Sequence, residues 1–392
     1  MDLQRLGSSP IGRLVPIMAP DPATGESVAG SAFLPDRLPR TIELSSDTWM
    51  RVTTATAALA RLDGAARLIP NPELLRVPAL RREAQSTSAL EGTYAPFADV
   101  LAADPDDAAA MSAELREVLN FEEMAGLAFT WPESRPLTIG MLSELQRVLV
   151  HGTVGELSDS GRLRDRIVVI GSRGRQLSEA RFVPPPPGDQ LRSELQNLLE
   201  WIGAPPNVPS VVQAAMAHYQ FETLHPFSDG NGRLGRLLIV VQLLRGAVIR
   251  EPLLVVSPWF EQRRDEYQDA LLELSCNGDW NTWINFFAEG VAASAADSQA
   301  KVERLVQLQA ELRATVQSAN KRGVAERLAG DLIGHPFVSR SDVAKRYGIS
   351  GQGAANAIAA LTDLRLLSPT QRRSATGAQR FVSDTVLSVL LT

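Results

Sequence analysis

Twelve consecutive residues, 225–236, combine side chains and glycines that suit a phosphate group: His-Pro-Phe-Ser-Asp-Gly-Asn-Gly-Arg-Leu-Gly-Arg. Gly230 and Gly232 permit a positive φ and a close backbone approach, so successive amides can point into one concavity where a helix begins. Arg233 and Arg236 are three residues apart and share one face of the first helical turn, where two guanidinium groups suit phosphate oxygens. The segment therefore predicts an anion site for phosphate.

Two further side chains of the segment predict chemistry at that site. The carboxylate of Asp229 would repel a phosphate unless a hard cation lies between them, and Mg²⁺ is the usual bridge, so Asp229 is the expected metal ligand. Pro226 fixes His225 at the end of the preceding helix, and histidine is the side chain that accepts a proton near neutral pH, so His225 is the expected general base. A lone His-Pro or Gly-Asn-Gly is usually a plain turn, but the combination predicts in-line displacement at phosphorus by a transferase or a hydrolase.

The segment resembles the motif of the Fic family, His-Pro-Phe-x-Asp-Gly-Asn-Gly-Arg-x-x-Arg, and matches every specified position. The resemblance extends over roughly residues 80–295 and includes residues 161–164, a flap at 167–183 with its proline tail at 184–187, and residues 217–219. It implies a protein adenylyltransferase that moves AMP from ATP to a Ser, Thr or Tyr hydroxyl of a protein. In that family mechanism His225 would deprotonate the hydroxyl, and Asp229 would hold Mg²⁺ on the α and β phosphates.

The resemblance also implies which residues bind the nucleotide and the target. Gly230 to Gly232 would cradle the phosphates, Phe227 would anchor the loop, and Tyr267 either lines the adenine pocket or is an ordinary core tyrosine. The flap would align the target by adding it as a short strand. The expected nucleotide-binding residues are Phe227, Asp229, Gly230, Asn231, Gly232, Arg233, Leu234, Gly235, Arg236 and Tyr267, and the expected flap contacts are Glu179, Ala180, Arg181 and Phe182.

A second site is predicted far from this loop, at residues 87–92. A helix closed by Gly92 puts Glu91 in its last turn, where a carboxylate faces the negative end of the helix dipole at a cost of ~0.3–1 kcal/mol unless a cation offsets it. Glu91 is then either a solvated surface residue or half of an ion pair. The stretch from Thr87 to Gly92 is similar to the inhibitory motif of Fic proteins, which implies pairing with Arg236, the guanidinium expected at the γ-phosphate. The enzyme would restrain itself, and in some relatives the equivalent glutamate also supports removal of AMP.

The C-terminal residues 323–392 have the pattern of a helix-turn-helix. Ser341 is an N-cap before a short helix, a glycine turn follows, and a second N-cap precedes a helix at 354–362. Expected strands at 366–367 and 380–382 flank a loop with Arg372 and Arg373, so the module resembles a winged helix. Eight Lys or Arg stand against five Asp or Glu from residue 324 onward. This modest excess leaves DNA binding and a dimerising or partner-docking role both open.

The periodicity around these sites predicts a mainly α protein with a Fic-type helical core, a small β-hairpin flap and the C-terminal module. Helices are expected at 49–62, 80–91, 108–129, 138–150, 189–201, 210–224, 232–244, 259–274 and 279–321, the last broken in places. Residues 166–170 and 181–183 carry the one strand signal before the C-terminus. The predicted parts are an extended arm at 1–45, a helical region with the inhibitory helix at 46–135, the catalytic core at 136–300, a linking helix at 301–322 and the module at 323–392.

Composition sets the remaining expectations. The chain has 392 residues, a net charge of −6 and a single cysteine, Cys276, which cannot form an internal disulfide. No signal-like start and no apolar run near the ~20 residues of a membrane span are present, so a cytoplasmic protein is expected. The expected partners are protein hydroxyl groups, including its own. A homodimer and DNA stay open, as do a DNA-binding regulator that senses ATP and a Fic enzyme with another donor.

Overall fold

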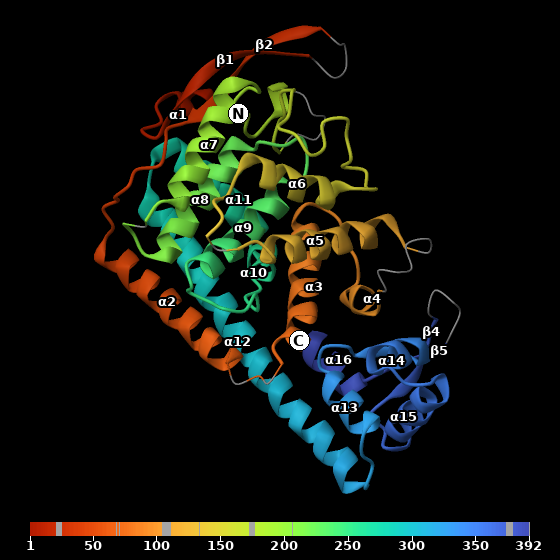
Figure 1. Ribbon diagram of the computed structural model, residues 1–392. Helices are drawn as coiled ribbons and strands as arrows, with labels where there is room; N and C mark the ends of the chain where they lie inside the picture. The colour runs from red at the N-terminus through yellow and green to blue at the C-terminus, as the bar shows by residue number, and fades with distance from the viewer. Residues whose placement is uncertain are drawn as a thin grey trace. The chain divides into compact units, whose positions relative to one another are not determined.

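The computed structural model describes residues 1–391 except 21–25, 68, 70, 104–110, 133, 172–176, 206 and 374–378. The described chain is mainly helical and forms two compact units. One unit consists of Met1–Leu59, Asn120–Ile249 and Val256–Ala293, and the other of Ala60–Leu119, Arg250–Val255 and Ser294–Thr392. Figure 1 shows the elements of both units in chain order. Within the described ranges, no helix is both long and apolar enough to cross a membrane.

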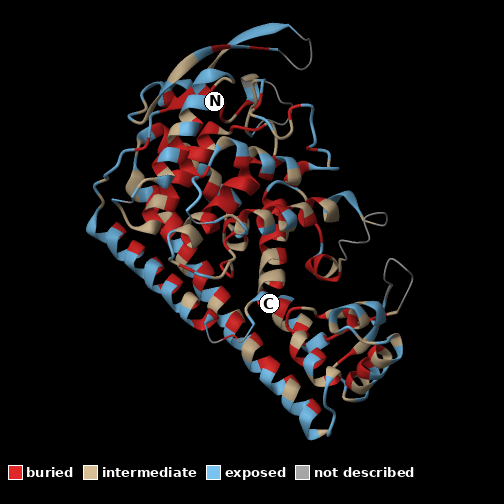
Figure 2. Cartoon of the chain, viewed as in Figure 1, coloured by how far each residue is buried: buried red, intermediate tan, exposed pale blue. Residues whose placement is uncertain are grey.

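Two central helices, α8 (Ser210–Leu224) and α9 (Asn231–Arg245), form the middle of the first unit. Their buried residues lie on all sides, which Figure 2 shows as nearly continuous red, and a helix buried all round belongs to the inside of a core. They pack against each other, with α6 (Ile139–Val150) against α9 and α7 (Asp189–Gly203) against α6 and α8. The loop at 225–230 is thus a short link between two buried helices, as the pattern predicted.

The N-terminal 45 residues are more ordered than an extended arm. After α1 (Leu3–Gly7), strands β1 (Gly12–Pro20) and β2 (Ser27–Pro35) pair antiparallel along their whole length. The expectation of a single strand signal before the C-terminus is therefore wrong. Pro16 and Pro20 argued against a strand because proline removes a ladder donor, but a two-stranded hairpin has outer edges where proline is tolerated.

The flap is also different from the expected hairpin. Only one bridge joins its arms among the described residues, between Ile170 and Phe182, and a short 3-10 helix, η2 (Leu177–Glu179), precedes the returning arm. Residues 172–176 at its expected turn lie outside the described residues. Instead of continuing the flap ladder, the carbonyl of Val183 accepts a hydrogen bond of 2.8 Å from the N–H of Phe33. The returning arm therefore pairs with the end of β2.

The other helices differ from the expectations mainly at their ends. The observed bounds are α2 (Ser46–Ala66), α3 (Glu73–Leu90), α4 (Phe97–Ala102), α5 (Ala113–Phe129), α10 (Ser257–Gln262), α11 (Arg264–Asn277) and α12 (Trp280–Ser318). The helix expected at 259–274 is two helices, and the breaks expected in 279–321 are absent because α12 is one helix of 39 residues. Helix α3 begins seven residues before its expected start and contains Pro78 in its interior.

The C-terminal part of the second unit contains α13 (Val324–Asp331), β3 (Phe337–Ser339), α14 (Arg340–Tyr347), α15 (Gly351–Asp363), β4 (Ser368–Arg373), β5 (Gln379–Val382) and α16 (Asp384–Leu391). The three strands form one antiparallel sheet in the order β3-β5-β4. Gly348, with φ 62°, separates α14 from α15 as predicted, and Ser350 caps α15.

Three details of this part correct the sequence predictions. The cap of α14 is Ser339, in a capping box with Asp342, and not Ser341. The strand expected at 366–367 begins at Ser368, because the N–H of Leu366 still bonds back to α15. Arg380, which was counted toward a basic surface, is buried and donates to the carbonyl of Ala102 at the end of α4.

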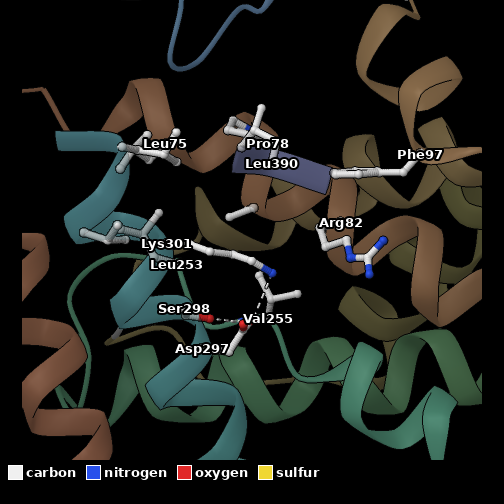
Figure 3. A pocket seen from close by; sticks show the side chains of 13 residues that line it. Leu75, Pro78, Arg82, Phe97, Leu253, Val255, Asp297, Ser298, Lys301 and Leu390 are labelled. Carbon is white, nitrogen blue, oxygen red and sulfur yellow. Dashed lines mark hydrogen bonds and ion pairs between the residues drawn. The ribbon is translucent and has the colours of Figure 1, made fainter. Parts of the chain in front are cut away.

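A small pocket in the second unit separates α3 from α12, and Figure 3 shows its side chains. Its walls are mostly apolar, and the ammonium of Lys301 is held by Asp297 at 2.9 Å. Arg82 lies over the Phe97 ring, 5.1 Å from its centroid. The cavity volume is only about 50 Å³, room for a few water molecules and not for a nucleotide.

Candidate active site

His225 terminates α8 in a left-handed conformation. Its φ is 46° and ψ 60°, and its N–H bonds to the carbonyl of Phe221 as the helix cap. Pro226 disfavours the α conformation at the residue before it, so the helix ends here by local chemistry. A left-handed residue other than glycine is uncommon and persists only where its surroundings hold it. The histidine side chain is therefore directed by the backbone of this turn.

Arg164 is the residue that holds the turn. Its guanidinium is buried and donates to four backbone carbonyls, those of His225 at 2.8 Å, Arg166 at 3.0 Å, Leu224 at 3.4 Å and Pro185. The backbone N–H of Arg164 donates to the carbonyl of Pro226 at 3.0 Å. Burial lowers the pKa of Arg164 to about 10. The sequence placed Arg164 only in a stretch that resembles the family, and nothing in its neighbours revealed this positioning role.

The half-buried ring of His225 has a defined orientation. Its Nδ1 lies 3.3 Å from the carbonyl oxygen of Glu222, one turn earlier in α8. A carbonyl can only accept, so this contact favours the tautomer with the proton on Nδ1 and the lone pair on Nε2. An imidazole in that tautomer can take a proton through Nε2.

The loop after His225 is closed by its own residues. The buried Asn231 side chain accepts from the N–H of Phe227 at 2.9 Å and donates to the carbonyl of Phe227 at 2.8 Å. The ring of Phe227 is fully buried, as expected for an anchor. The Ser228 hydroxyl donates to the buried carboxylate of Asp159 at 2.5 Å. These bonds fix the loop through side chains that point inward.

Helix α9 begins directly at this loop. Gly230 is its N-cap, with φ 84°, and a Cβ there would lie 2.8 Å from a methyl carbon of Leu149, so glycine is needed for both conformation and space. The first regular helical bond runs from the N–H of Leu234 to the carbonyl of Gly230. The amides of Asn231 and Gly232 precede that bond, at the positive end of the helix dipole. This is the geometry of a phosphate site.

Asp229 is the exposed carboxylate of the loop. One oxygen accepts from Nη2 of Arg233 at 2.7 Å, and the side chain is 38% exposed. Gln146 donates to its carbonyl at 3.2 Å. A Cβ on Gly155 would lie only 2.9 Å from its carboxylate. Gln146 and Gly155 thus position Asp229, although neither stood out in the sequence.

The surroundings of Asp229 define which cation could fit. Among the residues that the structure describes, no group of three or more His, Cys, Asp or Glu could hold a metal ion. A cation at Asp229 would therefore need phosphate oxygens and water as its other ligands. Mg²⁺ in nucleotide sites is bound in that way, by one or two carboxylates together with phosphates.

Two matches with known protein families cover the middle of the chain. Residues 49–130 match the Fic/DOC family N-terminal model, and residues 136–243 match the Fic/DOC family model. The chain contains both Fic/DOC domains. The loop from His225 to Arg236 lies within the residues that match the second model.

Two curated proteins match part of this chain at moderate sequence identity. The "Protein adenylyltransferase Fic" of Culex quinquefasciatus is 34% identical over 119 residues, which are 30% of this chain and 22% of that protein. The protein of the same name in Drosophila yakuba is 28% identical over 200 residues, 49% of this chain and 37% of that protein. The match thus spans less than two fifths of either relative.

A solved structure has a similar fold over most of the chain. It is a Fic family protein from Desulfovibrio desulfuricans G20, with a TM-score of 0.57 and 22% identity. The alignment covers 87% of this chain and 97% of that one. The similarity supports a Fic-like, mainly helical fold.

Both arginines of the Fic motif are buried, and the buried His218 lies close to Arg236. Burial, with the charge of Arg236 as a second cause, lowers the pKa of His218 to about 3. The His218 ring bonds to the Tyr267 hydroxyl at 2.7 Å through Nε2 and lies 3.2 Å from the carbonyl of Gly235 through Nδ1. His218 therefore supports the start of α9 as a neutral group.

Two of the expected nucleotide contacts of the Fic domain are core residues. Tyr267 is buried, and its ring packs in an aromatic cluster with His218, Phe260 and Trp283. This placement favours the core role that the sequence left open over a place in the adenine pocket. The side chain of Leu234 is fully buried as well, and its amide is used within α9.

The four flap residues expected to contact a target, 179–182, are partly buried under the N-terminal hairpin. Phe182 packs with Phe33, their ring centroids 5.7 Å apart, and Ala180 packs with Ile17 and Ala32. Arg181 forms an ion pair with Asp269, and Glu179 is exposed. The backbone of Phe182 pairs with Ile170, and the carbonyl of Ala180 accepts from the amino group of Met1, so both residues are used within the first unit.

The predicted inhibitory motif ends α3 as expected. Thr87 is buried, Glu91 is the exposed residue that follows Leu90, and Gly92 has φ 97°. The N–H of Thr93 bonds to the carbonyl of Ser88 at 2.9 Å, which completes the glycine cap. Glu91 and Arg236 belong to different compact units, so their pairing remains a prediction.

Proposed function

We propose that the chain is a protein adenylyltransferase that moves AMP from ATP to a Ser, Thr or Tyr hydroxyl of a protein. The two Fic/DOC domains and the names of the curated relatives support this activity. The observation that carries it is the turn at His225. Arg164 holds that turn at 2.8 Å, and Asp229 lies at the start of α9 four residues later.

The chemistry follows from the residues of the loop. Nε2 of His225 takes the proton of the acceptor hydroxyl while its oxygen bonds to the α-phosphorus; the bond from that phosphorus to the bridging oxygen breaks, and pyrophosphate leaves. The amides at the start of α9 and the guanidinium groups of Arg233 and Arg236 hold phosphate oxygens. Mg²⁺, when bound at Asp229, neutralises charge on the α and β phosphates.

The proposal includes restraint by Glu91. The Thr87–Gly92 motif and the position of Glu91 after the last residue of α3 support it, because a carboxylate at a helix C-terminus is stabilised by a cation. Pairing of Glu91 with Arg236 would occupy a guanidinium needed for the γ-phosphate. ATP would then bind with its α-phosphorus out of line for attack.

Labelled ATP tests the activity directly. The protein is incubated with α-labelled or γ-labelled ATP and Mg²⁺, and modified proteins are weighed by mass spectrometry. We expect label from the α position only, and a mass gain of one AMP. Label from the γ position, or a gain of one phosphate, would contradict AMP transfer and favour another donor group.

We further propose that residues 323–392 form a winged helix, because their helices and three-stranded sheet follow one another in the predicted order. A DNA-binding regulator is the alternative function for the whole chain. The burial of Arg380 weakens it, since this cation is used inside the unit. Filter binding at increasing salt separates the two, because phosphate contacts lose affinity steeply with salt.

A further inference from the structure

A groove of about 1050 Å³ opens beside Asp229 and Ser228 in the first unit. Its walls come from three segments that are far apart in the sequence. Residues 16–20 of β1 form one wall, residues 165–169 at the start of the flap and just before it form another, and Val154, Gly155 and Leu157 lie near the loop. Figure 1 shows β1 in the red N-terminal hairpin and the flap segment in yellow-green. The groove is about twenty times the volume of the pocket in Figure 3.

Consecutive residues of β1 and of the segment that leads into the flap border this groove. Side chains of an extended chain alternate between two faces, so a run of consecutive residues borders one cavity only along the edge of the strand. Five consecutive residues of β1 and five of the flap border it. Among the described strands, β1 pairs only with β2, so its other edge has no strand beside it.

The prolines of β1 determine which backbone N–H and C=O groups its outer edge presents. Pro16, Met18 and Pro20 are alternate residues, and in an antiparallel pair alternate residues turn their N–H and C=O groups to the same side. Prolines lack an N–H and fit the side that makes no ladder bonds. The outer edge therefore presents three carbonyls and the single N–H of Met18. This pattern pairs with a short extended segment in one register and blocks a longer sheet.

The rim of the groove is apolar. Met18, Val154 and Leu157 are 61%, 92% and 40% exposed, and all three border it. Exposed apolar side chains that gather along one groove mark an interaction surface. Among the described residues that border it, Arg166 is the one cation, and Asp165 and Asp229 are the carboxylates. The lining thus suits a peptide with apolar side chains better than a nucleotide.

We infer that the groove receives an extended segment of the acceptor protein, between the outer edge of β1 and the flap, with its hydroxyl residue beside Asp229. This inference rests on the proposed adenylyltransferase activity and adds the N-terminal hairpin as the second wall of the acceptor site. Residues 16–20 span roughly 15 Å at the usual rise of a strand. The segment therefore has about five residues in the groove, with apolar side chains around its hydroxyl residue.

Two proline variants of one hairpin test the inference. Met18→Pro removes the N–H on the groove edge of β1. Ala29→Pro is the matched control, because Ala29 pairs with Met18 and turns its N–H to the opposite edge of the hairpin. The full-length variants are assayed with α-labelled ATP and an array of twelve-residue peptides, each with one Ser, Thr or Tyr among apolar residues. Release of AMP to water, without peptide, is measured in parallel.

The expected result is a KM for labelled peptides that rises about tenfold in Met18→Pro, as for the loss of one backbone hydrogen bond. Ala29→Pro should match the wild type both in KM and in the rate of AMP release to water. Equal KM values in the two variants, or AMP release without labelling of any peptide, would overturn the inference and leave the proposed activity standing. Absence of both AMP release and transfer in Glu91→Gly, the variant without the proposed restraint, would contradict the proposed activity itself.

A second readout covers the case in which Met18→Pro does not fold. A photo-crosslinking phenylalanine analogue replaces Met18 or Ala29, and a labelled peptide from the array is irradiated with each protein. Crosslinks are expected from position 18 and not from position 29. Equal crosslinking at the two positions would contradict a binding edge on β1.

Discussion

The side chain of Asn231 holds the backbone of Phe227 by both of its polar groups. Nδ2 donates to the carbonyl at 2.8 Å, and Oδ1 accepts from the N–H at 2.9 Å. The loop between α8 and α9 is thereby closed from inside the protein. Asn231 thus shapes the loop, whereas His225 and Asp229 are the residues proposed to act on ligands.

Asn231→Ala should therefore weaken both stability and catalysis. It leaves two buried backbone groups of Phe227 without partners, which costs about 1–3 kcal/mol for each group, and the loop loses its fixed shape. We expect the free energy of unfolding in urea to fall and AMP transfer to drop by about 10²-fold, as for misplaced catalytic groups. Asn231→Asp, which can still accept from the N–H of Phe227, should retain more stability than Asn231→Ala. Equal stability of the two variants would contradict the double hydrogen bond.

His225→Ala should abolish AMP transfer without loss of ATP binding. The turn at this residue is held through its backbone carbonyl by Arg164, so removal of the imidazole leaves the phosphate site in place. Loss of a general base lowers the rate by about 10²–10⁴-fold. The control is His151→Ala, at an exposed histidine that contacts only the surface residue Glu156 among its described ion pairs. Retention of transfer by His225→Ala would rule out His225 as the base.

Elements that are stabilised by neighbouring residues could be predicted from the sequence, and elements that are stabilised by distant residues could not. The end of α8 and the glycine cap after Leu90 were predictable, because Pro226 and Gly92 act on the adjacent backbone. The β1–β2 hairpin was not, because Phe33 and Ile17 are buried against flap residues about 150 positions away. Arg164 was missed for the same reason, since its carbonyl partners come together only in the folded protein.

The second unit should lose stability in mild acid through His335. Burial, together with the charges of Arg346 and Arg81, lowers the pKa of His335 to about 4, against about 6.5 in an unfolded chain. Between these values the unfolded state binds the extra proton, so stability is full above pH 6.5 and falls as the pH drops toward 4. The difference between the two pKa values corresponds to ~3 kcal/mol in the free energy of unfolding.

Urea unfolding between pH 7.5 and 4 checks this dependence. His335→Gln cannot take the proton and should show a flatter dependence on pH, whereas His151→Gln, at the exposed histidine, should follow the wild type. His218 contributes in the same direction in the first unit, since burial also lowers its pKa. Identical pH profiles for His335→Gln and the wild type would contradict a half-buried His335 with a lowered pKa.

Glu91→Gly should raise AMP transfer, including transfer to the protein itself, if Glu91 restrains Arg236. The left-handed cap of α3 is at Gly92, whose φ is 97°. The glycine introduced at position 91 is therefore not needed for that conformation. Glu91→Gln separates charge from backbone freedom, because it keeps the side-chain length and removes only the negative charge. An ion pair with a buried guanidinium contributes about 1.5–3 kcal/mol, so we expect transfer to rise by at least tenfold in both variants. Incorporation of α-labelled AMP over time measures it, and equal rates for the wild type and Glu91→Gly would exclude restraint by Glu91.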